Sequence, residues 1–165
     1  IADMRDALEA VLGPISEPVL LPGGASKEAW AVDAGDERLL VRRAGGGVIH
    51  RHTLSLRHEF EVLRAAYDAG VKVPRPIAYV EDLEGREAFV MERLEGETIG
   101  RRIVRGPVPE RLPLQMAEEL AKIRELLGAA WSSGRYDEAA GVFRDLVMND
   151  TFVEFLTLPA YEKID

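Results

Sequence analysis

Apolar side chains recur every three to four residues in two early segments. Residues 2–12 place Met4, Ala7, Leu8, Val11 and Leu12 on one face, and residues 54–69 carry an apolar stripe of their own. That period is typical of amphipathic helices that cover a core with one side, so we expect a helix in each segment. Gly70 follows the second segment and is well suited to end a helix. The stripe of the second helix consists of Leu56, Phe60, Leu63 and Tyr67.

Other segments alternate in steps of two and are rich in β-branched and aromatic residues. Residues 17–21 predict a short strand, and residues 28–43 predict a hairpin that turns at AGDE. A second hairpin is expected over residues 76–94, where LEGR forms the turn. Two hairpins, a short strand and a helix with one apolar face indicate a mixed α+β unit.

The pattern becomes purely helical after about residue 110. Residues 112–127 and 136–147 each repeat apolar positions at helical spacing. A third helix is expected to begin near Asp150 or Thr151 and to end near Pro159. The change of pattern predicts two parts, an α+β domain over residues 1–110 and a helical segment over residues 111–165.

Composition narrows the choice of partners. Apolar residues make up 47% of the chain, which is enough for a buried core, and the formal net charge is -8. Polyanions repel an acidic chain, so we expect it to bind neither nucleic acid nor an anionic membrane. A nucleotide is not excluded, because it needs only local positive charge. The chain has no cysteine, and no apolar run approaches the ~20 residues of a membrane span, so a cytoplasmic location is expected.

A glycine pair between two predicted strands is the first candidate for anion binding. Glycine lets backbone N–H groups approach a phosphate closely. The pair is not a Walker loop, because it lacks the G-K-[ST] sequence and no helix directly follows it. A plain hairpin turn explains the same residues equally well. The turn consists of Gly23, Gly24, Ala25 and Ser26.

Charged residues near this turn could complete a pocket. Arg42 and Arg43 end a predicted strand, and their side chains must point to opposite faces. One of them could therefore reach beneath the glycine turn. Glu59 lies on the flank of the apolar stripe of the second helix, where its carboxylate could pair with Arg42 and orient it. The alternatives are that both arginines are solvated at the sheet edge and that Glu59 is an ordinary surface charge.

Four segments occur in an informative order and spacing: GGASKEAW, LLVRR, LRHEFEVLRAAYDAGVKVPRPIAYVED and EAFVMERLEGETIG. Together they resemble the small lobe of the aminoglycoside phosphotransferase and choline-kinase-like group, which has a protein-kinase-like fold. The resemblance covers roughly residues 5–110 and implies ATP and Mg²⁺ as cofactors. It also implies site residues: a nucleotide loop at Gly23 to Ser26, Arg42 in place of the phosphate-pairing lysine, Glu59 as its helix partner, and the backbone of Glu92 and Leu94 as the hinge that meets adenine.

Catalytic and metal-binding residues are not assigned. Phosphoryl transfer needs a group that positions the acceptor hydroxyl and carboxylates that hold Mg²⁺. In the resembled group these belong to a large lobe with an H-x-D loop, whereas no histidine follows residue 110 here and VMND at 147–150 has the wrong spacing. His50 and His52 lack a third metal ligand and fit an exposed loop. We therefore expect this chain to bind a nucleotide at most and to be inactive by itself.

The helical end resembles a different family. RYDEAAGVF and FVEFLTLPAYE are similar to the extreme C-terminus of malate synthase, where the tail is a helical cap. This resemblance covers about residues 115–165 and implies no acetyl-CoA or glyoxylate chemistry for this chain alone. The chain could be a fusion, a fragment or a chimera, with a missing lobe or a second copy as its partner. Two other functions stay open, a malate-synthase-related chain and a non-enzymatic interaction module.

Overall fold

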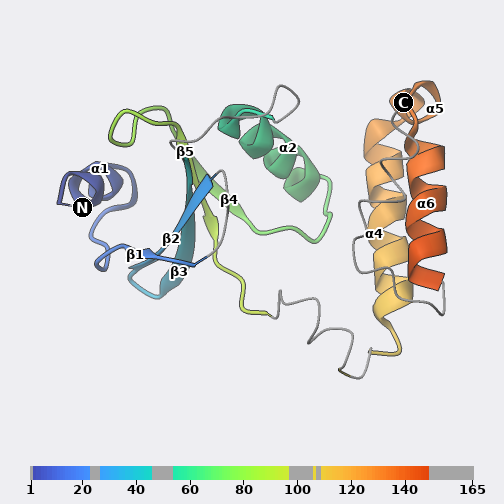
Figure 1. Cartoon of the computed structure of the whole chain (residues 1–165), viewed down its shortest axis with the longest axis horizontal. Helices are drawn as coiled ribbons and strands as arrows, with labels where there is room; N and C mark the ends of the chain where they lie inside the picture. The colour runs from blue at the N-terminus through green and yellow to red at the C-terminus, as the bar shows by residue number, and fades with distance from the viewer. Residues whose placement is uncertain (1, 23–26, 46–53, 97–105, 107–108, 149–165) are drawn as a thin grey trace. The chain divides into compact units, whose positions relative to one another are not determined.

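The computed structural model describes residues 2–22, 27–45, 54–96, 106 and 109–148. Figure 1 labels the helices and strands along the chain. The chain divides into two compact units, residues 1–103 and 104–165, and each is described by itself.

A five-stranded antiparallel sheet forms the frame of the first unit, and the α+β class predicted from the sequence is confirmed. The strand order is β1-β2-β3-β5-β4, so the two predicted hairpins lie next to each other and are joined by pairing of β3 with β5. This pairing places β3, the second strand of the first hairpin, at the centre of the sheet. The strands are β1 (Val19–Leu20), β2 (Lys27–Ala34), β3 (Glu37–Ala44), β4 (Pro76–Val80) and β5 (Ala88–Glu92).

The turn between β2 and β3 requires a glycine. Ala34 is paired with Glu37, which leaves a loop of Gly35 and Asp36. Gly35 has a φ of 59°, in the left-handed region that side chains with a Cβ rarely adopt. The AGDE turn predicted from the sequence is therefore confirmed and explained by the backbone conformation that the tight hairpin needs.

One face of the sheet carries the main hydrophobic core. Helix α1 (Ala2–Leu12) packs on this face, and Figure 1 shows it on the opposite side of the sheet from α2. Val11 was expected on the buried face of this helix, and this expectation is wrong because Val11 is 49% exposed. Met4 and Leu8 are fully buried, as their helical spacing predicted. They join alternate side chains of β2, β3 and β5 in one cluster. The buried members are Met4, Leu8, Ile15, Val32, Leu39, Val41, Val80, Leu83, Ala88 and Val90.

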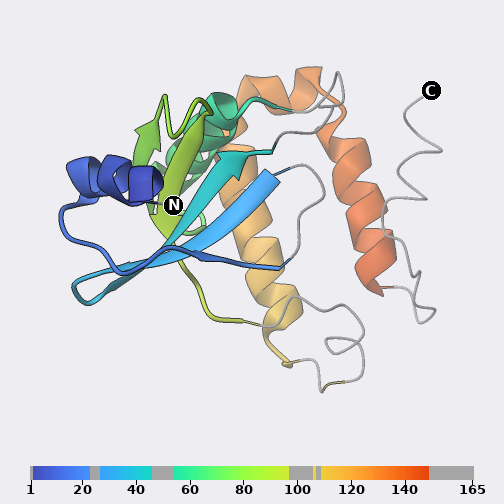
Figure 2. The ribbon, with the colours of Figure 1, turned by 60° about the vertical axis from the view of Figure 1, so that its left-hand side comes forward.

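Helix α2 (Leu56–Asp68) covers the other face, as Figure 2 also shows. Leu56 is buried, and the ring of Phe60 lies 5.8 Å from the ring of Phe89 on β5. Tyr67 was expected in the buried stripe, and this expectation is wrong because its side chain is 41% exposed. The inward side of α2 is rotated toward Glu59, so that Ala66 rather than Tyr67 is half-buried at that end of the helix.

Three helices make up most of the described part of the second unit. Trp131 is buried, its ring stacks on Tyr136 with 5.4 Å between centroids, and its indole N–H donates a hydrogen bond to Asp137. These contacts hold the short helix against the start of the last one. The helix expected near residues 151–159 lies outside the described residues. The helices are α4 (Leu112–Leu127), α5 (Ala129–Ser133) and α6 (Tyr136–Met148).

Across the residues that the structure describes, none of the helices combines the length and the apolar character needed to cross a bilayer.

Candidate anion-binding site

Two cationic side chains reach the α2 face of the sheet where β2 begins and β3 ends. Ala29 is paired with Arg42, and Lys27 stands two residues before Ala29 on β2. Because alternate residues of a strand share a face, Lys27 and Arg42 project from neighbouring strands to the same side. Arg42 is also aligned with Phe89, the aromatic residue on which α2 packs.

Helix α2 supplies the opposite charge. Ser55 caps the helix, because its Oγ accepts a hydrogen bond from the N–H of His58 at 3.2 Å. Glu59 follows in the first turn, where the helix dipole favours a carboxylate. Its Oε2 lies 3.7 Å from Nη2 of Arg42. The structure thus brings Arg42 and Glu59 together, in place of the alternative that Glu59 is an unrelated surface charge.

Lys27 is a third member of this site and was not predicted from the sequence. Its ammonium group donates a hydrogen bond to Oε1 of Glu59, and its side chain is only 11% exposed. The sequence does contain the necessary pattern. If the first hairpin is taken to begin at residue 27 instead of 28, Lys27 alternates onto the same face as Ala29. That face is the one on which Arg42 was expected, so the same alternation would have identified a second cation beside Glu59.

Arg42 has hydrogen-bonding capacity that the described residues do not use. Within the described part of the chain, no backbone or side-chain group accepts a hydrogen bond from its guanidinium, which carries five N–H donors. Its side chain is 38% exposed. Two cations and one carboxylate leave a local net charge of about +1 here. This combination of positive charge and unused N–H donors is chemically suited to an anion.

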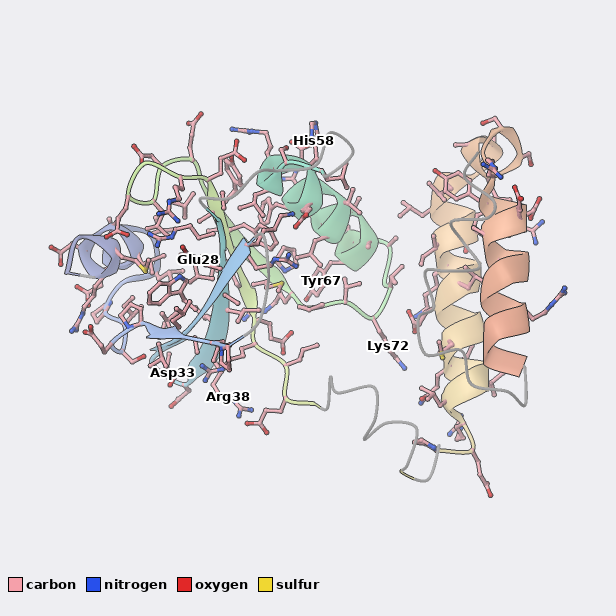
Figure 3. The ribbon with its side chains drawn as sticks, in the orientation of Figure 1. Glu28, Asp33, Arg38, His58, Tyr67 and Lys72 are labelled. Atoms are coloured by element: carbon pink, nitrogen blue, oxygen red, sulfur yellow. The ribbon has the colours of Figure 1, made fainter. Side chains whose placement is uncertain are left out.

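The other predicted site residues fall into two groups. Gly23, Gly24, Ala25 and Ser26 lie outside the described residues. Glu92 ends β5, where its N–H donates to the carbonyl of Arg75 at 2.9 Å and its carboxylate accepts from the N–H of Arg75 at 3.2 Å. Leu94 follows with a side chain that is 59% exposed. Glu92 and Leu94 therefore leave the sheet at the β2–β3 turn end, where Figure 3 shows Asp33 and Arg38.

Arg43 has a different role from its neighbour. It points to the α1 face and is buried, so the suggestion that both arginines are solvated edge residues is wrong. Its Nε and Nη2 donate to Oε2 of Glu28 at 2.9 and 2.6 Å, and its Nη1 pairs with Glu84. Trp30 donates its indole N–H to the same Glu28 carboxylate at 3.0 Å. Figure 3 shows Glu28 on the side of the sheet that faces α1.

The hydrogen bonds around Glu28 control its ionisation. Burial by itself raises the pKa of the Glu28 carboxyl, but hydrogen bonds from Arg43, Trp30 and Arg86 lower it, and the net pKa is below the ordinary value of 4.5. Each of these donors stabilises the charged carboxylate. The Arg43 cluster, defined as Glu28, Trp30, Arg43, Glu84 and Arg86, therefore stabilises the fold and has its hydrogen-bonding groups largely satisfied internally.

Acid should weaken the first unit through Glu28. Because the pKa of Glu28 is lower in the folded than in the unfolded chain, its stabilisation is complete above about pH 4.5 and is lost as the pH falls below that value. We expect Glu28→Gln to be less stable than the parent at pH 7, with the difference shrinking at pH 3.5. Urea unfolding at the two pH values measures this. Glu61→Gln, which changes an exposed carboxylate on α2, should follow the parent at both.

A metal site is not apparent in the described part of the chain. No group of three or more histidine, aspartate or glutamate side chains there could hold a metal ion. We therefore assign no Mg²⁺ ligand among the described residues and derive no step that uses the ion.

A model of the phosphotransferase enzyme family matches residues 18–157. The match extends well beyond residue 110 and through most of the segment compared above with malate synthase. That second resemblance gains no support, and neither do the two alternative functions that the sequence left open.

Individual relatives are distant and longer. Acyl-CoA dehydrogenase family member 11 from Homo sapiens and from Pongo abelii is 29% identical over 108 residues, and the match spans 62% of this chain but only 14% of those proteins. Aminoglycoside phosphotransferase APH(4)-Ia is 15% identical with a TM-score of 0.47, over 78% of this chain and 40% of that structure. Spectinomycin phosphotransferase APH(9)-Ia, in complex with ADP and spectinomycin, is 16% identical with a TM-score of 0.46, over 87% and 54%.

Proposed function

The chain belongs to the phosphotransferase enzyme family, and from that premise we propose that its first unit binds ATP, with the phosphates against Arg42. The phosphates would lie on the α2 face, where β2 begins. Gly23, Gly24, Ala25 and Ser26 directly precede Lys27 in the sequence and would offer backbone N–H groups to the same phosphates. We assign binding to this chain and no transfer step to its described residues.

The guanidinium of Arg42 carries the proposal. It is fixed by a β-strand at the centre of the sheet, lies beside a half-buried carboxylate, and donates no hydrogen bond within the described part of the chain. A guanidinium matches the geometry of phosphate oxygens, and each charge-assisted hydrogen bond to them contributes about 1.5–3 kcal/mol. An arginine placed in this way is better explained by an anionic ligand than by a contribution to folding.

The adenine would lie farther along the same face. Leu40 and Met91 are directly opposite each other on β3 and β5, and both alternate onto the face of Arg42. They offer the base an apolar surface. Glu92 is aligned with Leu39, about 10 Å along the strand from Arg42. The backbone of Glu92 and Leu94 would then meet the adenine edge while the phosphates reach Arg42.

Two related expectations belong to this proposal. Mg²⁺ would arrive with the nucleotide, because the described residues do not form a metal site of their own. The cytoplasm, where ATP is abundant, would be the place of action.

Calorimetric titration of the full chain with ATP, ADP, AMP and adenosine, in MgCl₂ at constant ionic strength, tests the proposal. Affinity should fall with each phosphate removed, and adenosine should bind at least about tenfold more weakly than ATP. Inorganic tripolyphosphate should also bind more weakly than ATP, because it lacks the base. Absence of binding at millimolar ATP, or equal affinity for ATP and adenosine, would refute it.

A further inference from the structure

The carboxylate of Glu59 lies between two cations but contacts them unequally. Lys27 donates a hydrogen bond to Oε1, whereas Nη2 of Arg42 stays 3.7 Å from Oε2, outside hydrogen-bonding distance. Glu59 thus makes a direct hydrogen bond with Lys27 and only a looser ion pair with Arg42.

Burial also indicates that Glu59 is held more firmly by Lys27 than by Arg42. The Lys27 side chain is far less exposed than that of Arg42, and a buried ammonium is costly unless a carboxylate compensates it. Arg42 is partly solvated and has less need of the pair. Breaking the contact between Lys27 and Glu59 therefore costs more than lengthening the contact between Arg42 and Glu59.

We propose that Lys27 is a positioning residue, which occupies Glu59 and so leaves the Arg42 guanidinium available to phosphate. The inference rests on the proposed function, since it assigns Lys27 a part in ATP binding without contact to ATP. Arginine and carboxylate form strong paired hydrogen bonds when no competitor intervenes. If Lys27 were absent, Glu59 would take up the donors of Arg42 that the phosphates need.

The contact also links two parts of the site. Lys27 is the first residue of β2 and directly follows the glycine-rich residues 23–26, while Glu59 is in the first turn of α2. Through this ion pair, the point at which the chain enters β2 is attached to the helix that covers the same face. Lys27 can therefore position the site in two ways, through the charge of Glu59 and through the start of the strand.

Binding of Mg-ATP to four proteins tests this proposal: the parent, Lys27→Met, Glu59→Gln and the double variant. Titrations in about 0.5 M KCl, where the Debye length is about 4 Å, screen the general effect of net charge. We expect Lys27→Met to bind about tenfold more weakly, one or two hydrogen bonds of Arg42 being lost. The double variant should return to within about twofold of Glu59→Gln, and Lys27→Arg should stay close to the parent.

Unfolding equilibria test the ion pair without any nucleotide. A double-mutant cycle of Arg42→Met and Glu59→Gln, measured by urea unfolding, gives the factor by which the two changes depart from independent effects on the unfolding equilibrium constant. We expect this factor to be below about twofold when Lys27 is present and about fivefold in the Lys27→Met background. Failure of the parent to bind ATP would refute the proposed function, and this measurement would still decide whether Lys27 keeps Glu59 from Arg42. Equal coupling in both backgrounds, or a double variant as weak in ATP binding as Lys27→Met, would overturn the role of Lys27.

Discussion

Replacing Arg43 with methionine should lower the free energy of unfolding of the first unit by about 3 kcal/mol. The guanidinium is buried and donates two hydrogen bonds to Glu28 while it pairs with Glu84. Its removal leaves the Glu28 carboxylate in a partly desolvated place with fewer donors. We place the value at the low end for a broken buried pair, because Glu28 and Glu84 keep some access to solvent. Urea unfolding followed by circular dichroism measures it.

Arg42→Met is the matched control, because it makes the same change one residue earlier on the same strand. Arg42 is partly exposed and donates no hydrogen bond within the described residues, so its loss should change the free energy of unfolding by about 0.5 kcal/mol or less. Adding Glu28→Met to Arg43→Met should recover part of the lost stability, since an apolar pair replaces an unbalanced charge. A loss below about 1 kcal/mol for Arg43→Met would mean that the cluster behaves as a surface ion pair.

Leu8→Ala should destabilise the first unit by about 2–5 kcal/mol. Leu8 is fully buried and belongs to the cluster that joins α1 to Val32, Val41 and Val90 in the sheet. The substitution removes buried apolar surface and leaves a cavity that the strands can close only in part. Unfolding followed by the fluorescence of Trp30, in a Trp131→Phe background, reports on the first unit because Trp30 packs against this cluster.

Val11→Ala provides the control on the same helix. Val11 is 49% exposed, and alanine favours a helix at least as well as valine, so its free energy of unfolding should stay within about 0.5 kcal/mol of the parent. Equal small losses for the two variants would show that α1 does not contribute to the core of this unit.

Periodicity predicted the parts of the fold in which one face is buried. Met4 and Leu8 on α1, and the alternating residues of β3, repeat at spacings that only one secondary structure explains. The AGDE turn could also be predicted, because a hairpin with a two-residue loop needs the left-handed backbone conformation that Gly35 adopts. Tyr67 was misplaced because the helical period alone does not determine how the inward side of α2 is rotated.

Charge pairing was harder to predict, because it depends on residues that are distant in sequence. Arg43 is buried on the core face of β3, where Glu28 and Glu84 from other parts of the chain neutralise its charge, and these partners cannot be identified from its place beside Arg42. Lys27 meets Glu59 across 32 positions, and its place just before the expected start of the first hairpin concealed the face to which it points. The pairing of Arg42 with Glu59 was suggested by the position of Glu59 on the flank of its helix, and the family resemblance implied the same pair.

The proposed function depends on the claim that Arg42 provides the cation that faces the phosphates of ATP. Calorimetric titration of the full chain with Mg-ATP and with adenosine, comparing the parent with Arg42→Met, tests it most directly. Arg64→Met, which removes one exposed positive charge from α2, is the control for net charge. We predict that Arg42→Met weakens ATP binding at least about tenfold and leaves adenosine binding unchanged, while Arg64→Met alters neither by more than about twofold. Unchanged affinity of Arg42→Met for ATP, in a protein that still folds, would contradict the claim.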